Sequence, residues 1–210
     1  MPKRTNSSAR WLNEHANDFY VKQAKKEGYR SRAAFKLLEI QSRDHLLKSG
    51  MLVVDLGAAP GGWSAVAKQK VGETGRVIAV DILPMPPLPG VECIQGDFYL
   101  DEVLVVMMQH IENRAVDLVM SDMSPNITGI NIVDQARAYD LSEHALLFAQ
   151  QVLKPNGSFL IKVFQGQGFE VFLKQIRACF SKVNIRKPNA SRGRSQEVYI
   201  VSTGYIPLAF

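Results

Sequence analysis

The chain has 210 residues, 46% of them hydrophobic and 21% charged, so it can bury one compact core without disulfides or metals, and we expect a single domain. No stretch approaches the ~18 apolar residues that cross a bilayer, and the N-terminus has no apolar signal segment; this excludes a membrane-spanning protein and indicates a soluble, cytoplasmic one. We expect it to be a monomer. The formal net charge is +5, which matters once it is divided along the chain.

Residues 1–48 form a basic segment that we expect to be helical and to pack beside the core at residues 49–210. They contain eleven Lys/Arg and five Asp/Glu, a net charge of +6, so the remaining chain carries −1. The clearest helix of this segment is predicted at residues 31–41. A second basic stretch, residues 182–194, has five Lys/Arg and no acid. Two basic stretches beside a nearly neutral body suggest a polyanionic partner, although ordinary solvated faces would give the same pattern.

From residue 51 onward, apolar strand-like runs alternate with helical patterns. Strands are predicted at residues 51–56, 76–82, 91–95, 116–121 and 158–164. Helices are predicted at residues 61–71, about 100–112, about 135–153 and 168–180. The alternation is typical of an α/β protein with a doubly wound, mostly parallel sheet and helices on both faces. The proline-rich residues 84–90 can be neither helix nor central strand and must form a loop.

The end of the chain departs from this alternation. Strands predicted at about residues 183–187 and at residues 197–203 are separated by roughly nine residues, too few for a parallel crossover, so they should pair antiparallel. A seven-stranded mixed sheet with one antiparallel strand resembles the Rossmann-like sheet of class I methyltransferases rather than a dinucleotide-binding sheet. Cys93 and Cys179 lie far apart in apolar runs, without a CxxC pair or clustered histidines. We therefore expect two buried free thiols and no metal.

The most specific local motif is the glycine-rich turn between the first predicted strand and the following helix. Ligands of open α/β sheets bind at such turns, at the carboxyl ends of the strands. A dinucleotide site would direct several backbone amides at a pyrophosphate, whereas here the glycine spacing differs and a proline removes one donor. The turn therefore predicts a cofactor without phosphate. The residues that we expect to form this part of the site are Asp55, Gly57, Pro60, Gly61, Gly62 and Trp63, although Trp63 could equally be a packing residue.

Two carboxylates extend this predicted site. Asp81 ends the second strand, where an acid can accept both ribose hydroxyls of an adenosine. Asp97 follows the third strand and could accept a hydrogen bond from the adenine amino group, with Phe98 as its apolar neighbour. Either acid alone could be a loop-capping residue, but their register with the glycine-rich turn favours an adenosine-containing ligand.

Lys162 is a candidate catalytic residue because it lies in the apolar run 159–164. A lysine in a strand that is buried on both faces is costly unless it is paired, because desolvation disfavours its charged form. Asp122 ends the fourth predicted strand, at the same sheet edge as the glycine-rich turn, and is its expected partner.

Four residues of the chain resemble the Lys-Asp-Lys-Glu tetrad of the FtsJ-like RNA 2'-O-methyltransferases: Lys36, Asp122, Lys162 and Glu197. The resemblance extends over nearly the whole chain and includes the glycine-rich turn. It implies an enzyme that uses S-adenosyl-L-methionine to methylate a uridine ribose of bacterial large-subunit ribosomal RNA, with the RNA or the large ribosomal subunit as its partner.

The chemistry of a 2'-hydroxyl explains why such residues are needed, since this hydroxyl is a poor nucleophile at neutral pH. Lys162 could act as a neutral base or as a cation that stabilises the developing alkoxide, and the sequence does not decide between them. Lys36 and Glu197 would complete a network of alternating charges that holds the ribose. The residues expected to bind RNA are Arg32, Lys36, Arg192 and Arg194.

Other functions stay open at this point. A methyltransferase that acts on base amines would carry an Asp/Asn-Pro-Pro-aromatic motif after the fourth strand, and the chain reads Asp122-Met123-Ser124-Pro125 there. Transfer RNA and mRNA caps are alternative substrates that the catalytic residues do not separate. A non-catalytic RNA-binding module would explain the basic stretches but not the complete tetrad.

Overall fold

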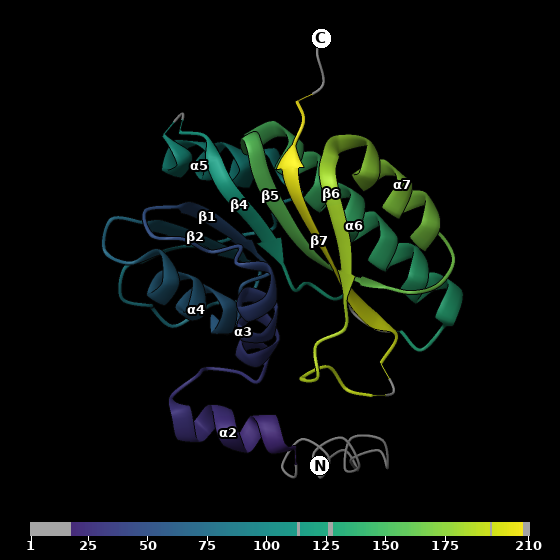
Figure 1. Cartoon of the computed structure of the whole chain (residues 1–210), viewed down its shortest axis with the longest axis horizontal. Helices are drawn as coiled ribbons and strands as arrows, with labels where there is room; N and C mark the ends of the chain where they lie inside the picture. Colours follow the sequence, from purple (N-terminus) through teal and green to yellow (C-terminus); the bar gives the residue numbers. More distant parts are fainter. Residues whose placement is uncertain (1–17, 113, 126–127, 194, 208–210) are drawn as a thin grey trace.

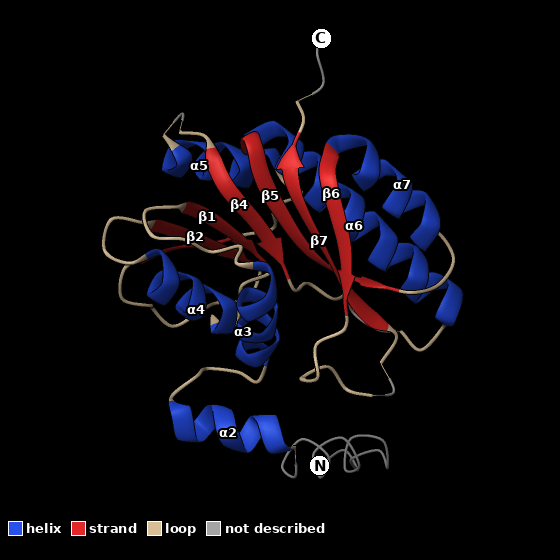
Figure 2. Cartoon of the chain, viewed as in Figure 1, coloured by secondary structure: helices blue, strands red, loops and turns tan. Residues whose placement is uncertain are grey.

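A computed structural model describes residues 18–112, 114–125, 128–193 and 195–207, which form one sheet with helices on both faces (Figure 1). Figure 2 distinguishes the red strands of this sheet from the blue helices around them. The strands are β1 (Leu52–Leu56), β2 (Arg76–Asp81), β3 (Val91–Gln95), β4 (Val116–Ser121), β5 (Leu153–Phe164), β6 (Phe180–Arg186) and β7 (Glu197–Tyr205). The helices are α2 (Phe19–Glu27), α3 (Ala33–Asp44), α4 (Gly62–Val71), α5 (Asp101–Ile111), α6 (Asn131–Val152) and α7 (Phe169–Cys179).

The strand order is β3-β2-β1-β4-β5-β7-β6, and the predicted antiparallel ending is confirmed. Strands β1 to β5 are parallel, whereas β7 lies antiparallel between β5 and β6. Strands β1 and β4 are neighbours in the middle of the sheet. After β1 the chain continues to β2 on one side of this pair, and after β4 it continues to β5 on the other side, so the direction in which strands are added reverses here. Such a reversal opens a crevice at the carboxyl ends of the strands, which is where open α/β sheets bind ligands.

Two apolar layers cover the sheet. One layer lies under α5, α6 and α7 and includes Val54, Phe159 and Phe172. The other lies under α3 and α4 and includes Leu37 and Val53. Every residue of β1 is buried, as expected for a strand covered on both faces, and Asp55 is the one ionisable residue in its otherwise apolar run.

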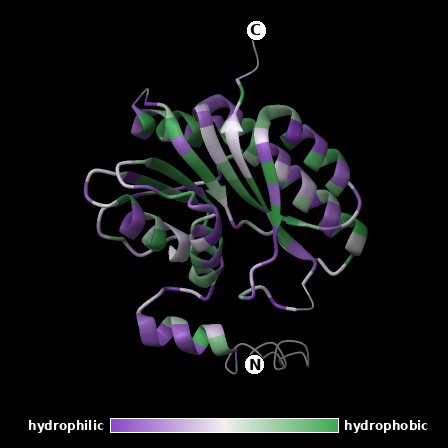
Figure 3. Ribbon diagram, in the orientation of Figure 1, coloured by the Kyte–Doolittle hydropathy of each residue, from purple (hydrophilic) through white to green (hydrophobic). Residues whose placement is uncertain are grey.

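Helix α3 packs on the second layer, whereas α2 packs on α3 through a small cluster that contains Ala24 and Phe35. The side chain of Asp18 caps α2 by accepting from the backbone amide of Tyr20 at 2.9 Å. Much of α2 is hydrophilic (Figure 3), with Lys22, Lys25 and Lys26 exposed. Residues 18–48 thus contain two helices, and the exposed lysines of the first of them carry part of the positive charge of this segment.

The structure differs from the sequence-based expectation at the junction of α6 and β5. Residues 154–157, expected to be a loop, belong to β5, which begins directly after α6. The pairing of β4 with β5 shifts register between Val116 and Leu118, where the extra residues form a bulge. Asn156 takes a φ of 63° there, a conformation that asparagine tolerates better than most residues.

The expectation of two buried thiols is wrong for Cys93. This residue is exposed because β3 is an edge strand, whereas Cys179 is buried as expected. Within the described ranges, no three His, Cys, Asp or Glu side chains group as a metal site. No helix of the described chain has the length and apolar character needed to span a membrane.

Candidate active site

A cleft of about 550 Å³ opens at the carboxyl ends of β1, β2 and β4. This volume is in the range of about 300–1,000 Å³ that is typical of small-molecule sites. The cleft is bordered by the glycine-rich turn, by the loops after β2, β3 and β4, and by α6. Residues of the predicted cofactor site that line it are Gly57, Asp81, Asp97, Phe98 and Asp122.

Gly57 shapes the floor of the cleft. It adopts a φ of 72°, and a Cβ built on it would lie 2.0 Å from Cγ of Met123. A side chain at this position would therefore collide with the loop after β4, and the left-handed backbone conformation itself favours glycine. The turn after β1 and the loop after β4 can approach each other closely only because this residue has no side chain.

Other residues of the predicted cofactor site brace the turn from behind and do not line the cleft. The indole of Trp63 donates to the carbonyl of Ala33 at 2.8 Å, which ties α4 to α3. Gly62 packs against Ser31, since a Cβ there would lie 2.3 Å from the Ser31 hydroxyl oxygen. The side chain of Trp63 is thus buried and packs between α4 and α3.

Pro60 and Gly61 face the proline-rich loop at residues 84–90. The carbonyl of Pro60 accepts from Nη1 of Arg30 at 3.3 Å, and the same guanidinium donates to the carbonyls of Pro86 and Pro87 at 2.6 and 2.7 Å. A Cβ on Gly61 would lie 2.7 Å from Cδ1 of Leu88. The proline-rich loop, expected from the sequence, is therefore held against the glycine-rich turn.

Asp55 is buried beneath the turn and accepts a hydrogen bond of 2.6 Å from the hydroxyl of Ser64 on α4. Burial raises the pKa of Asp55 to about 7, and the nearby carboxylates of Asp122 and Asp81 add to the increase while the Ser64 hydrogen bond opposes it. Asp55 therefore positions the turn rather than contacting a ligand in the cleft.

The carboxylates in the cleft already hold its loops. The two oxygens of Asp81 accept from the backbone amides of Ala59 and Leu83, both at 2.8 Å. Asp97 accepts from the amide of Tyr99 at 3.0 Å. A carboxylate has about four acceptor sites, so these bonds are compatible with further donors from a ligand.

The four tetrad residues come together from four separate elements. Lys162 on β5 donates to the backbone carbonyl of Asp122 at 2.6 Å and lies 3.2 Å from its carboxylate. Lys36 on α3 pairs with Glu197 on β7 at 2.7 Å and lies 4.0 Å from the Asp122 carboxylate. Both lysines are buried, with 8% and 7% of their surface exposed. The charges thus alternate along a continuous network at the edge of the cleft.

Tyr199 joins the two halves of this network and was not predicted. Its hydroxyl donates to the Asp122 carboxylate at 2.7 Å and accepts from Nζ of Lys36 at 2.8 Å. Burial raises the pKa of Tyr199 well above its usual range, and the negative charges of Asp122 and Glu197 raise it further. The signal was present in the sequence, because residues two apart on a strand share one face, so Tyr199 lies beside Glu197 on β7.

The positive charge beside Glu197 stabilises the ionised form of its carboxyl group. Burial alone would raise its pKa, but the positive charge and hydrogen bond of Lys36 outweigh burial and lower the pKa of Glu197 below its usual value. The carboxylate of Glu197 therefore stays charged at neutral pH.

The predicted RNA-binding arginines fall in different environments. Arg32 pairs with Asp18 and donates to the carbonyl of Ala190, with 15% of its side chain exposed. This differs from the expected phosphate contact, because the guanidinium joins the start of α2 to the loop between β6 and β7. Arg192 lies half-buried in that loop, and Arg194 lies outside the described residues.

The loop between β6 and β7 is fastened to α3 beside the tetrad. Both oxygens of the Glu39 carboxylate accept backbone amides, from Asn189 at 2.6 Å and from Ala190 at 3.2 Å. Lys36 and Glu39 are three residues apart and share one face of α3, so the face that carries a tetrad lysine also holds the loop that leads into Glu197.

Comparison with known proteins identifies the group to which this arrangement corresponds. A family model described as FtsJ-like methyltransferase matches residues 29–205. A protein named ribosomal RNA large subunit methyltransferase E from Nitrosospira multiformis is 57% identical over 202 residues, covering 96% of this chain and 98% of the relative. A protein of the same name from Thiobacillus denitrificans is 58% identical over 200 residues, covering 95% of this chain and 91% of the relative.

Solved structures share the fold. A ribosomal RNA methyltransferase from Plasmodium falciparum matches with a TM-score of 0.77 and 24% identity, covering 86% of this chain and 100% of that structure. An rRNA-methylase structure from Clostridium thermocellum matches with a TM-score of 0.54 and 18% identity, covering 80% of this chain and 97% of that structure.

Proposed function

This chain belongs to the FtsJ-like methyltransferase family, and from that membership we propose that it methylates the 2'-hydroxyl of a uridine in bacterial large-subunit ribosomal RNA. The observation that carries the proposal is the network of Lys36, Asp122, Lys162 and Glu197 at the edge of the cleft. Relatives named for this substrate, matched over nearly the full length of both chains, support ribosomal RNA over transfer RNA or an mRNA cap.

The methyl donor proposed for the cleft is S-adenosyl-L-methionine, which would supply an activated methyl group on a positively charged sulfur. The lining is rich in carboxylates, with Asp81, Asp97, Asp122 and Asp140 against the single cation of Arg137 among its lining residues. Such a lining favours a ligand with cationic and hydrogen-donating groups and disfavours a pyrophosphate. We assign the ribose hydroxyls to Asp81, the adenine to Asp97 and Phe98, and the methyl-bearing end to Asp122.

Lys162 is the residue to which we assign the reacting hydroxyl. Its amine donates to the backbone carbonyl of Asp122 and lies 3.2 Å from the carboxylate of the same residue, so two negatively polarised oxygens face the amine. This supports the cationic role, in which Lys162 stabilises negative charge as it develops on the ribose oxygen. Lys36 and Glu197 would hold the ribose, and the buried hydroxyl of Tyr199 keeps Lys36 and Asp122 in place.

The proposal is tested by incubating the purified chain with methyl-labelled S-adenosyl-L-methionine and large ribosomal subunits prepared from cells that lack this protein. We expect label in a single ribose of the RNA. A control substrate with a 2'-deoxynucleotide at that position should take up none. Label in transfer RNA instead, label on a base, or binding of RNA without transfer would each identify one of the alternative functions and contradict this one.

The Lys162→Ala and Lys162→Arg variants separate the two roles of the lysine. Arginine keeps the positive charge but does not act as a base, because its pKa is above ~12. We expect Lys162→Ala to bind the cofactor and lose most turnover, and Lys162→Arg to recover part of it. An arginine variant as inactive as alanine, together with a wild-type rate that rises with pH, would support the neutral base instead.

A further inference from the structure

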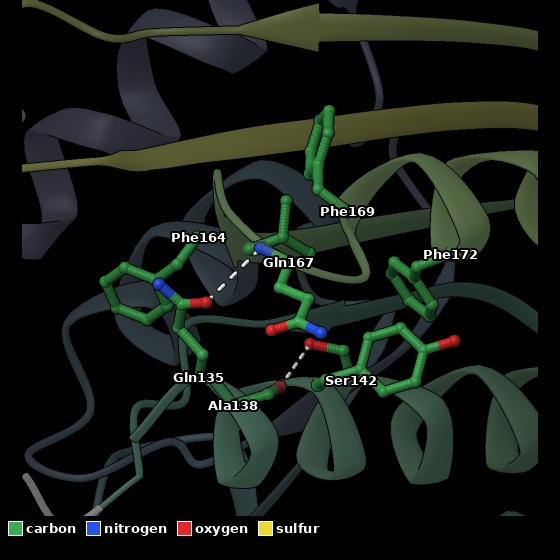
Figure 4. Close-up of a pocket in the computed structure, with 9 residues that line it drawn as sticks. Gln135, Ala138, Ser142, Phe164, Gln167, Phe169 and Phe172 are labelled. Carbon is green, nitrogen blue, oxygen red and sulfur yellow. Dashed lines mark hydrogen bonds between the residues drawn. The ribbon is translucent and has the colours of Figure 1, made fainter. Parts of the chain in front are cut away.

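A small hollow lies next to the tetrad, outside the cofactor cleft. It is formed by α6, by the end of β5 and by the start of α7, and Figure 4 shows its lining residues. Its volume is about 20 Å³, enough for a water molecule but not for a nucleobase. A second hollow, which Lys162 lines, shares Ala138, Ser142 and Phe164 with the first. Because they share these residues the two hollows are adjacent, and together we call them the depression beside Lys162.

Phe164 is the residue that connects this depression to the tetrad. It follows Lys162 by two positions at the end of β5, and Nζ of Lys162 lies 5.9 Å from the centre of its ring. Lys36 lies over the other aromatic ring of the network, that of Tyr199, at 5.4 Å. Tyr199 is fully buried, whereas Phe164 keeps part of its surface exposed. Phe164 is therefore the ring of this pair that an incoming substrate can reach.

The reaction places a base near this ring. The base of a nucleotide is attached to the ribose carbon next to the one that bears the 2'-hydroxyl. A hydroxyl held at Lys162 therefore brings its own base into the neighbourhood of Phe164. Unpaired bases of RNA are recognised by stacking on aromatic side chains. The partly exposed ring of Phe164, which lies close to Nζ of Lys162, can provide such a stacking surface.

The surroundings of Phe164 hold amide groups that suit the edge of a base. Oε1 of Gln135 accepts from the backbone amide of Gln167 at 3.2 Å, and this bond joins α6 to the turn after β5. A Cβ on Gly166 would lie 3.1 Å from the amide carbon of Gln135, so this turn packs closely on that side chain. Figure 4 shows both glutamines beside Phe164. Side-chain amides both donate and accept hydrogen bonds, as the polar edge of a base requires.

We propose that the ring of Phe164 is the platform on which the base of the target nucleotide stacks, with the edge of that base over the hollow between Gln135 and Gln167. This inference rests on the proposed function and adds to it the residue that holds the base. Because the hollow is smaller than a base, the base lies across its mouth and against the ring. Phe164 is thus a substrate-binding residue that directs one nucleotide to Lys162.

A substrate without a base at the target position tests the proposal. Methyl transfer is measured for the wild type and for Phe164→Leu on two RNAs, one intact and one with an abasic ribose that keeps its 2'-hydroxyl. On the intact RNA we expect Phe164→Leu to lower kcat/KM by about 5- to 150-fold, the range measured for the loss of one stacked base. On the abasic RNA the two proteins should be equally active, because the interaction that the variant removes is already missing.

Two further variants keep the result interpretable. Phe164→Tyr keeps an aromatic ring and should retain most activity on the intact RNA. Phe19→Leu removes an exposed ring on α2, and any effect it has should be the same for both RNAs. Cofactor affinity measured by calorimetry confirms that each variant is folded.

Three results would overturn the assignment of Phe164: unchanged kcat/KM in Phe164→Leu, an equal loss on both RNAs, or a loss in Phe164→Tyr as large as in Phe164→Leu. Failure of the proposed function is a separate observation, because in that case the wild-type protein transfers no methyl group to the intact RNA.

Discussion

At the scale of single residues, the site depends on a few buried polar groups whose partners are distant in sequence. Lys36 and Tyr199 are separated by 163 positions, yet their side chains meet at 2.8 Å. Tyr199 is positioned to fix both Lys36 and the carboxylate of Asp122, and a buried hydroxyl with two charged partners has little freedom to move. The tetrad therefore acts as a unit that includes a fifth side chain.

Removing the bridging hydroxyl should slow catalysis without preventing cofactor binding. We expect Tyr199→Phe to lower kcat by about 10- to 150-fold, because hydrogen bonds to charged groups each contribute about 1.5–3 kcal/mol. The variant is assayed for kcat, KM for RNA and cofactor affinity. Tyr205→Phe is the matched control, since its buried hydroxyl donates to the carbonyl of Gln150 at 2.8 Å, away from the tetrad. Equal kcat values for the two variants would show that Tyr199 has no special role.

The buried carboxyl of Asp55 should give the fold a pH dependence of its own. Its pKa is about 7 in the folded chain and about 3.9 when unfolded, so the folded state binds the extra proton between these values. The free energy of unfolding should therefore fall as pH rises from about 4 to 7, by at most about 1.4 kcal/mol per pH unit from this group.

Asp55→Asn removes this titration and keeps a side chain that can bond to Ser64. Denaturant unfolding at a series of pH values should show a flatter profile for Asp55→Asn than for the wild type between pH 4 and 7. Asp101→Asn, an exposed carboxylate in the first turn of α5, serves as the control. A profile for Asp55→Asn that parallels the wild type would show that Asp55 does not hold a proton in this range.

At the scale of elements, the succession of strands and helices along the chain was predictable because each carries its own apolar pattern, and the antiparallel ending follows from a short connection. What the sequence could not supply is contact between distant segments. Arg32 was expected to face RNA, but its partners are Asp18 and the carbonyl of Ala190, which no local pattern indicates. Cys93 was expected to be buried, since an apolar run does not reveal that its strand lies at the sheet edge.

The residues that line the cleft were predictable in part, and those that support it from behind were not. The positions of Asp81, Asp97 and Asp122 follow from the rule that parallel strands end at one edge of a sheet. That Asp55 and Trp63 brace the turn from behind depends on the packing of α3 and α4, which is a three-dimensional property. Phe164 likewise became a candidate only when its ring was seen beside Lys162.

The attachment of the loop between β6 and β7 to α3 gives a prediction about this element. Glu39→Ala removes the acceptor of the Asn189 and Ala190 amides, so both amides should exchange with solvent faster. Hydrogen exchange followed by NMR measures this directly. Glu170→Ala, an exposed acid in the first turn of α7, should leave both amides unchanged. Unaltered exchange in Glu39→Ala would show that the loop is held by other contacts.

At the scale of the whole molecule, a group of exposed lysines lies next in the chain to the helix that carries a residue of the tetrad. The exposed lysines of α2 lie on the segment that leads into α3, and α3 carries Lys36. The acidic cleft and the exposed lysines of α2 thus have opposite charge, which suits a small cationic ligand in the cleft and a polyanion at α2.

Neutralising the exposed lysines of α2 should weaken RNA binding and reduce its salt dependence. For Lys22→Gln, Lys25→Gln and Lys26→Gln combined, we expect the slope of log K against log salt to decrease by about 0.7 for each phosphate that the protein no longer neutralises. Cofactor affinity should not change. Lys48→Gln with Lys70→Gln is the control, because these residues precede β1 and β2 and so lie toward the amino ends of the strands, opposite the cleft. An unchanged slope in the α2 variant would exclude these lysines from the RNA-binding surface.

The central claim is that this chain methylates one ribose of large-subunit ribosomal RNA through Lys162. The most direct measurement maps 2'-O-methylation across that RNA in cells that lack the protein and in the same cells supplied with the wild type or with Lys162→Ala. We predict that a single ribose methyl group is absent without the protein, is restored by the wild type, and is not restored by a stably produced Lys162→Ala. An unchanged methylation map in the cells that lack the protein, or full restoration by Lys162→Ala, would contradict the account.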